Sequence, residues 1–295
     1  MKTNFNIYVI KSFFYIKIKF IIYNHIRFAF FLIRDTILKD ENQNERRREM
    51  KYKLYFKLEE AYLSIGFRTV FLSFIKRSLT EYENGLYFSK FFDGANVKRY
   101  CFSVRLPPCV FDKDFIQLSE NSWTVSVSTC DTKTGLILYN AFISQKYKPF
   151  PLEKGNNMTL TAIQAEMPKP ITKSKIVGKM SMPLCIRFHD KETNKDVYYT
   201  YQDEKFQETL RFVLINQVRT VLGVEESIFE NFSFVPLQMR KTMIRHYGTM
   251  IPVSLGTFEM TGHPLLLNYF LDEGVASRRS SGFGTFTVLF ERGGD

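Results

Sequence analysis

Cysteine and histidine are both scarce in this sequence. The four cysteines are scattered, with no Cys-x-x-Cys spacing and no cluster of histidines beside them: Cys101, Cys109, Cys130 and Cys185. A zinc site and a disulfide framework are therefore not expected, and we predict neither a metal nor another cofactor. Scattered thiols suit a reducing compartment, which predicts a cytoplasmic protein.

Long uninterrupted apolar runs are missing from the N-terminal segment, residues 1–49, although Phe and Ile are frequent there. A membrane-spanning helix needs about 20 mainly apolar residues, and no small-residue cleavage site marks a signal peptide. Six polar side chains break the runs: Lys11, Lys17, Lys19, Asn24, His25 and Arg27. No membrane partner is therefore expected, with a basic interfacial helix as the alternative.

We favour a different interpretation of residues 1–49, which is upstream DNA translated from a mis-assigned start. Residues 45–50 (ERRREM) can be encoded as GAA-AGG-AGG-AGA-GAA-ATG. This reading places a ribosome-binding sequence just ahead of Met50, the predicted native start. The mass of the native N-terminus tests the prediction.

The remaining composition is that of a globular protein with a bias toward positive charge. An apolar fraction of 45% supports a packed core, and 295 residues allow one large or two ordinary domains. The net charge of +11 and pI near 9.3 favour a polyanionic partner or an acidic membrane surface.

Hydrophobic periodicity divides the chain into two similar halves. In the first half, residues 51–59 alternate as a strand, residues 67–82 follow a helical spacing, and residues 100–106 alternate again. Further strand-like runs cover residues 123–129, 136–145 and 158–167, and no second helix is visible. The stiff segment Pro168–Thr172 (PKPIT) is the best candidate for a domain boundary.

The second half predicts a β-α-β-β-α-β order. A strand over residues 179–188 precedes a long helix over 203–222, and two strands at 234–246 and 250–261 flank a Tyr247-Gly248 turn. A short helix begins at Pro264 and runs through residues 265–272, with Gly274 in the αL position that ends a helix, and residues 285–290 form a last strand. This order is that of the ferredoxin-like or RNA-recognition topology.

We therefore predict an α+β protein of two tandem ferredoxin-like domains. The N-terminal domain covers residues 50–167 and the C-terminal domain residues 173–292, with residues 1–49 as a doubtful extension.

The segment at residues 274–284 (GVASRRSSGFG) has the composition of a phosphate-binding loop. Its three glycines permit positive φ, and its serines and arginines can contact phosphates or 2′-hydroxyls. Phe283 can pack inward or stack on a base. The alternative is a glycine-punctuated connection between helix and strand with a solvated arginine pair, because glycine motifs alone are weak.

The stretch GTFEMTGHPLLLNYFLDEG at residues 256–274, followed by SRRSSGFGTFTVL at 277–289, resembles the C-terminal signature of the Cas-six family. That family consists of CRISPR-associated endoribonucleases of the RAMP superfamily. The resemblance covers roughly residues 175–291, and residues 51–106 fit the family's N-terminal domain in pattern.

The resemblance implies metal-independent cleavage of CRISPR repeat RNA. The ribose 2′-oxygen attacks the adjacent phosphate and leaves a 2′,3′-cyclic phosphate and a 5′-hydroxyl. The glycine-rich loop helps to hold the RNA. The predicted RNA-binding residues are Arg278, Arg279, Ser280, Ser281, Gly282, Gly284, Arg99 and Lys90.

The sequence departs from the family where many relatives carry a catalytic histidine, aided by Tyr and Lys. Residues 87–100 contain no histidine, and none occurs between Met50 and Phe188. One interpretation assigns catalysis to Lys98, which best matches the family's lysine, with Tyr100 beside it. The alternative for Lys98 is a plain surface position or a contact to the RNA backbone.

The other interpretation assigns catalysis to His246, at the end of the basic run at residues 240–247 (RKTMIRHY), which can contact RNA. Its alternative is a partly buried histidine at a strand end. His263, directly before Pro264, is expected to cap a helix, and His189 to be only solvent-exposed.

Two functions other than cleavage remain open. One is a module that holds the repeat RNA without cutting it, and the other is a non-enzymatic subunit of a CRISPR effector complex. Other effector-complex subunits and a second copy in a homodimer are further candidate partners.

Overall fold

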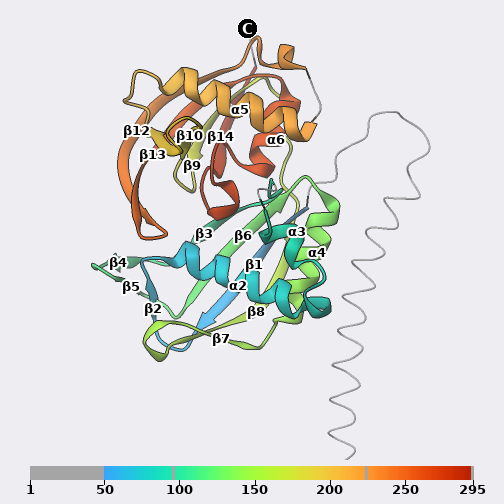
Figure 1. Ribbon diagram of the computed structural model, residues 1–295, viewed down its shortest axis with the longest axis vertical. Helices are drawn as coiled ribbons and strands as arrows, with labels where there is room; N and C mark the ends of the chain where they lie inside the picture. The colour runs from blue at the N-terminus through green and yellow to red at the C-terminus, as the bar shows by residue number, and fades with distance from the viewer. Residues whose placement is uncertain (1–49, 95–96, 223–224, 294–295) are drawn as a thin grey trace, which may run out of the picture. The chain divides into compact units, whose positions relative to one another are not determined.

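The computed structural model describes residues 50–94, 97–222 and 225–293, which fall within one compact unit (Figure 1). The prediction that translation starts at Met50 concerns residues 1–49, which lie outside the described residues. Within the described ranges, no helix is long and apolar enough to cross a membrane.

The N-terminal sheet has the strand order β3-β6-β1-β8-β7. Its strands are β1 (Met50–Leu58), β3 (Cys101–Arg105), β6 (Ser122–Thr129), β7 (Pro149–Pro151) and β8 (Asn157–Glu166). In β1 every second side chain from Tyr52 to Leu58 is buried, while the lysines between them are partly or fully exposed. This alternation gives the sheet one buried face.

Two helices, α2 (Phe67–Glu81) and α4 (Thr132–Ser144), pack on that face. The Phe74 ring of α2 lies 5.1 Å from the Phe56 ring of β1, and Phe142 of α4 lies 5.8 Å from Phe74. Burial of these large rings against one another stabilises the N-terminal core.

The α4 helix corrects the prediction of a strand at residues 136–145 and supplies the second helix that the first half lacked. Asp131 is its N-cap and accepts a hydrogen bond from the Thr134 backbone N–H. The apolar residues 136–138 fit either a strand or a helix, because a short apolar run carries no decisive period. The Asp131 cap and the packing of these residues on β1 stabilise the helical conformation over a strand.

The C-terminal sheet has the strand order β12-β13-β9-β14 and carries one long and one short helix. Its elements are β9 (Lys175–Met180), β12 (Ser233–His246), β13 (Thr249–Thr261), β14 (Phe286–Arg292), α5 (Phe206–Leu222) and α6 (Pro264–Glu273). Strand β9 is the centre of the core, with Gly178 so close to the Phe258 ring that a Cβ would lie 2.6 Å from it.

A single strand predicted at residues 179–188 is wrong, because the chain leaves the sheet at Met180 and forms β10 (Ile186–Asp190) in a separate hairpin with β11 (Lys195–Tyr199). Another small sheet joins β2 (Tyr62–Ser64), β4 (Cys109–Phe111) and β5 (Phe115–Leu118). The remaining short elements are α3 (Phe88–Phe92), η1 (Tyr82–Gly85), η2 (Glu153–Gly155), η3 (Glu226–Phe229) and η4 (Arg279–Ser281).

The two larger sheets share one topology, which confirms the predicted α+β class and the tandem ferredoxin-like folds. In each, β-α-β-β-α-β elements give a sheet in which the first and third strands are central: β3-β6-β1-β8 and β12-β13-β9-β14. Each sheet has its own hydrophobic core.

The end of α6 joins the C-terminal sheet to the N-terminal one. The Ser128 hydroxyl of β6 donates to the Asp272 carbonyl over 2.6 Å, and the backbone N–H of Cys130 donates to the Glu273 carboxylate over 2.9 Å. Asp272 and Glu273 are both buried. The loop that follows them is therefore held against the N-terminal sheet, and η4 contacts β3 (Figure 1).

Candidate functional site

The loop at residues 274–284 connects α6 to β14, and two of its glycines are required by close approach. A Cβ on Gly282 would lie 2.6 Å from the Phe102 ring, and one on Gly284 would lie 2.0 Å from the Val275 carbonyl. Both have positive φ, at 79° and 73°. Gly274 also has positive φ, but its ψ of 171° is not the αL conformation that the sequence predicted.

The two adjacent arginines of the loop point to different environments. The Arg279 side chain is 9% exposed, and its Nη1 donates to the Glu273 carbonyl over 2.9 Å and lies 3.3 Å from the Glu273 carboxylate. Arg278 is partly exposed, as are Ser280 and Ser281. Of the two arginines predicted to contact phosphate, only Arg278 is therefore near the surface.

Phe283 adopts the inward one of its two expected positions. Its ring is fully buried and lies 5.3 Å from the His246 ring and 5.2 Å from the Arg68 guanidinium. Arg68 also donates from Nε to the Gly282 carbonyl over 3.1 Å. The loop is thus fixed from both domains.

Arg278 belongs to a group of five polar side chains, which we call the Asp196 cluster: Arg187, His189, Asp196, Tyr198 and Arg278. The Asp196 carboxylate lies 3.1 Å from Arg187, 3.0 Å from His189 Nδ1 and 3.4 Å from Arg278. Burial raises the pKa of Asp196, but hydrogen bonds from His189 and Arg187 and the charges of both arginines outweigh it. The pKa of Asp196 is therefore lowered, and the carboxylate is ionised at neutral pH.

His246, a predicted catalytic residue, is buried at the end of β12. It is 4% exposed, and its Nε2 has no hydrogen-bond partner among the described residues. Burial lowers the pKa of His246 to about 4, with further lowering by the charges of Arg278 and Arg68. The imidazole is therefore neutral at neutral pH.

Lys98 and Tyr100, the other predicted catalytic residues, differ in their access to solvent. The Lys98 ammonium lies 4.5 Å from the centre of the Phe92 ring, and Lys76 lies 5.3 Å from the same ring. Burial, followed by the charge of Lys76, lowers the pKa of Lys98. Tyr100 is fully buried, its hydroxyl has no partner among the described residues, and burial raises its pKa well above the usual value.

Lys90 and Arg99, the residues of the N-terminal domain predicted to bind RNA, have other neighbours than Lys98. Arg99 Nη1 lies 3.5 Å from the Asp131 carboxylate at the start of α4. Lys90 is exposed on α3, with its ammonium 5.9 Å from the Phe91 ring centre. His263 caps α6 by accepting from the Leu265 backbone N–H over 3.2 Å, as the sequence predicted.

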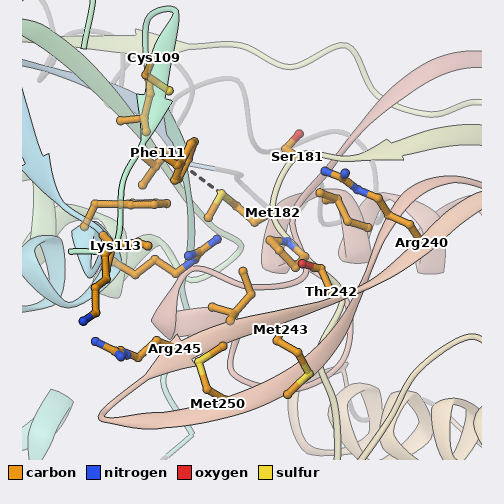
Figure 2. A pocket seen from close by; sticks show the side chains of 18 of the residues that line it. Cys109, Phe111, Lys113, Ser181, Met182, Arg240, Thr242, Met243, Arg245 and Met250 are labelled. Atoms are coloured by element: carbon orange, nitrogen blue, oxygen red, sulfur yellow. Dashed lines mark hydrogen bonds between the residues drawn. The ribbon is translucent and has the colours of Figure 1, made fainter. Parts of the chain in front are cut away.

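The sequence did not predict a cleft of about 630 Å³ between the two ferredoxin-like folds (Figure 2). One wall comes from Ile65 after β2, the start of α2, the end of β3 and β4 with the turn after it, and the other from residues 181–183 and the β12–β13 hairpin. Four cations line it: Arg68, Lys113, Arg240 and Arg245. No carboxylate is among the described residues that line the cleft, although Asp114 lies 3.9 Å from Arg245.

Apolar side chains fill the space between these cations. Phe111 is 59% exposed, Met243 is 47% exposed and Met250 is 50% exposed. Cations beside open aromatic and thioether surfaces can hold phosphates and unstacked bases together. The basic run at residues 240–247 was the sequence signal for one wall, but the opposite wall is formed by residues far away in the chain.

Metal-ligating side chains are not clustered in the described ranges, where no group of three or more His, Cys, Asp or Glu side chains could hold an ion.

Comparison with solved structures finds the same fold in proteins of low sequence identity. A RAMP protein described as binding different RNA substrates has a TM-score of 0.69 and 17% identity, over 82% of this chain and 100% of its own. The product of a Cas6-related gene from Pyrococcus furiosus has a TM-score of 0.69 and 15% identity, over 83% and 100%. A product complex of Thermus thermophilus Cas6 has a TM-score of 0.60 and 12% identity, over 82% and 100%.

Residues 165–288 match the family described as CRISPR associated protein Cas6, C-terminal. The match covers the C-terminal part of the chain, which is therefore similar to the family that the loop and its flanking residues resemble. No curated protein sequence matches the chain significantly.

Proposed function

We propose that this protein binds CRISPR repeat RNA in the cleft between its two folds and cuts it without a metal ion. The supporting observation is the cleft itself, where Arg68, Lys113, Arg240 and Arg245 surround exposed apolar surface and no lining carboxylate of the described chain opposes them. Such a surface attracts the phosphates of a nucleic acid and offers contacts to its bases.

The proposed reaction is attack of a ribose 2′-oxygen on the adjacent phosphate. The products are a 2′,3′-cyclic phosphate and a 5′-hydroxyl, and the protein contributes by positioning the 2′-oxygen in line and by stabilising the extra negative charge. The predicted catalytic residues are Lys98, Tyr100 and His246. Lys98 is the accessible one, so we propose that it places a cation beside the RNA backbone, the role proposed also for Lys90 and Arg99.

In the glycine-rich loop, we propose that Arg278, Ser280 and Ser281 contact the RNA, whereas the predicted contacts of Gly282 and Gly284 are replaced by hydrogen bonds of their backbone inside the protein. Arg279 is assigned a different role, because its charge is already paired with Glu273 inside the protein. It fixes the shape of the loop rather than contacting phosphate.

The second candidate function is a module that holds repeat RNA without cutting it. The observation that favours it is the burial of Tyr100 and His246, because the Tyr100 hydroxyl and the His246 Nε2 have no contact with solvent. Neither can touch a substrate unless the two folds move.

Incubation of the full chain with labelled repeat RNA in EDTA tests the proposal and its alternative. Cleavage of the repeat at one position supports the endoribonuclease. Tight binding of intact RNA supports the module, and no preference for the repeat over a scrambled RNA of equal length contradicts both.

Two further proposals concern the cellular location of the protein and its assembly with other chains. We propose a cytoplasmic location, with other CRISPR effector-complex subunits or a second copy of the chain as further partners. Light scattering of the purified protein, with and without repeat RNA, tests the homodimer.

A further inference from the structure

His189 differs from the other two histidines of the described residues in its access and its partner. His246 is buried, and His263 uses Nδ1 to cap a helix. The His189 side chain is 45% exposed, and its Nδ1 lies 3.0 Å from the Asp196 carboxylate. No hydrogen bond to its Nε2 occurs within the part of the chain that the structure describes.

The β10–β11 hairpin places the members of the Asp196 cluster on one face. His189 is paired directly opposite Asp196 in the antiparallel register, and Arg187 is opposite Tyr198. Because side chains alternate along a strand, these four share a face. Phe188 points to the other face, where its ring lies 6.1 Å from Phe212 of α5.

The glycine-rich loop adds the fifth member and fixes its position. The backbone N–H of Ser277 donates to the Cys185 carbonyl over 2.9 Å, and the backbone N–H of Arg187 donates to the Ser277 hydroxyl over 3.2 Å. Arg278 has a positive φ of 58° and donates to the Tyr198 hydroxyl over 2.5 Å. The loop therefore holds a second guanidinium beside Asp196.

This geometry determines the form of the His189 ring. A carboxylate only accepts hydrogen bonds, so Nδ1 of His189 carries the proton and donates it to Asp196. In the neutral ring, Nε2 then has a free lone pair. A base fixed by a carboxylate, with two guanidinium groups nearby, is an arrangement suited to attack on a phosphate diester.

We infer that His189 is a catalytic residue of the proposed RNA cleavage, with Asp196 as its positioning residue and with Arg187 and Arg278 as cations for the phosphate. This inference rests on the proposed function and assigns the proton transfer to the C-terminal domain. Lys98, in the N-terminal domain, is then a contact to the RNA backbone.

The proposed cleavage step needs no reactant other than the RNA, the His189 side chain and water. Nε2 of His189 takes the proton of the ribose 2′-hydroxyl while the O2′–P bond forms. The P–O5′ bond then breaks, and the departing 5′-oxygen takes a proton from water. The imidazolium returns its proton to solvent, and the arginines stabilise the added charge on the non-bridging oxygens.

The test compares His189→Ala, Asp196→Asn and Lys98→Met in the full chain. Single-turnover cleavage of repeat RNA is measured with and without added imidazole, and binding is measured with RNA that carries a 2′-deoxy nucleotide at the cleavage site. His263→Asn is the matched control, because it removes an imidazole from the surface while asparagine retains the helix cap.

We expect His189→Ala to lower the cleavage rate about 100-fold or more, within the range for loss of a general base, while binding stays unchanged. Added imidazole should restore part of the rate for His189→Ala. It should not do so for Asp196→Asn, because that variant keeps the His189 ring and has lost only the carboxylate that holds the proton on Nδ1. His263→Asn should cleave like the wild type. Lys98→Met should lower binding and cleavage in parallel.

Three outcomes overturn the inference. If His189→Ala cleaves at the wild-type rate, His189 is not catalytic, and the proposed endoribonuclease stands. If binding falls as far as cleavage and imidazole restores nothing, His189 is an RNA contact only. If the wild type binds but never cuts the repeat, both the inference and the proposed cleavage fail.

Discussion

At the scale of single residues, the environment of His246 makes stability depend on pH. The folded protein lowers its pKa to about 4, whereas an unfolded chain leaves a histidine near 6.5. The unfolded state therefore binds the extra proton first as the pH falls. The stability that His246 contributes is complete above about pH 6.5 and is lost progressively toward pH 4.

His246→Gln should remove this pH dependence. The free energy of unfolding, measured in urea between pH 4 and pH 7, should fall by up to about 3 kcal/mol more in the wild type than in the variant. Carboxylates titrate in both proteins, so their effect cancels in the difference. Parallel curves for the two proteins would show that His246 is protonated equally in both states.

Arg278 and Arg279 show what a sequence cannot tell about single residues. The two are neighbours of the same type in a glycine-rich segment, and both were predicted to contact phosphate. Arg279 turns inward because Glu273 is buried beside it, and Glu273 is buried because the end of α6 rests on β6. The contact between α6 and β6 joins residues about 140 positions apart in the chain, so no local sequence pattern predicts it.

At the scale of elements, hydrophobic periodicity correctly predicted the secondary structure of segments that have one buried and one exposed face. Strand β1 and helix α2 each have one buried and one exposed face, and both were predicted close to their observed bounds. Helix α4 was missed because residues 136–138 are all apolar. The break between β9 and β10 was missed although Pro183 marks it, because the apolar residues on both sides of the proline continue the strand-like pattern.

The junction of α6 with the N-terminal sheet should depend on the buried pair of Glu273 and Arg279. Glu273→Gln leaves the Arg279 charge buried without its counter-ion, and we expect a loss of about 3–5 kcal/mol in the free energy of unfolding. Arg219 and Glu226 form an exposed pair, so Glu226→Gln should cost less than about 1 kcal/mol.

A double variant separates loss of the pair from general damage at that position. Glu273→Gln with Arg279→Met removes the unpaired charge, so it should be less destabilised than the sum of the two single variants. Equal losses for Glu273→Gln and Glu226→Gln in urea denaturation would show that the junction does not depend on this pair.

At the scale of the whole molecule, the cleft is formed only when both folds are in place. Its candidate site could not be predicted from the sequence, because Lys113 and Arg245 belong to different folds and are separated by more than one hundred residues. The loop residues, by contrast, were visible from their composition. Composition identifies a loop with unusual backbone freedom, but a cleft between two surfaces requires the tertiary structure.

Lys113→Ala combined with Arg245→Ala should weaken RNA binding through lost phosphate contacts. We expect about a tenfold lower affinity and a salt dependence whose logarithmic slope is reduced by about 1.4, which corresponds to two contacts with a single strand. Arg219→Ala is the matched control, since Arg219 is exposed on α5 and is not part of the cleft. Equal affinity of the double variant and the control at all salt concentrations would place the RNA elsewhere.

The central claim is that the protein cuts repeat RNA by attack of a 2′-oxygen. Mass spectrometry of the fragments formed in EDTA tests it most directly, with a second RNA carrying one 2′-deoxy nucleotide on the 5′ side of the cut. The account predicts a 2′,3′-cyclic phosphate and a 5′-hydroxyl from the first RNA and no cut at that position in the second. A 3′-hydroxyl with a 5′-phosphate, or equal cleavage of both RNAs, would contradict it.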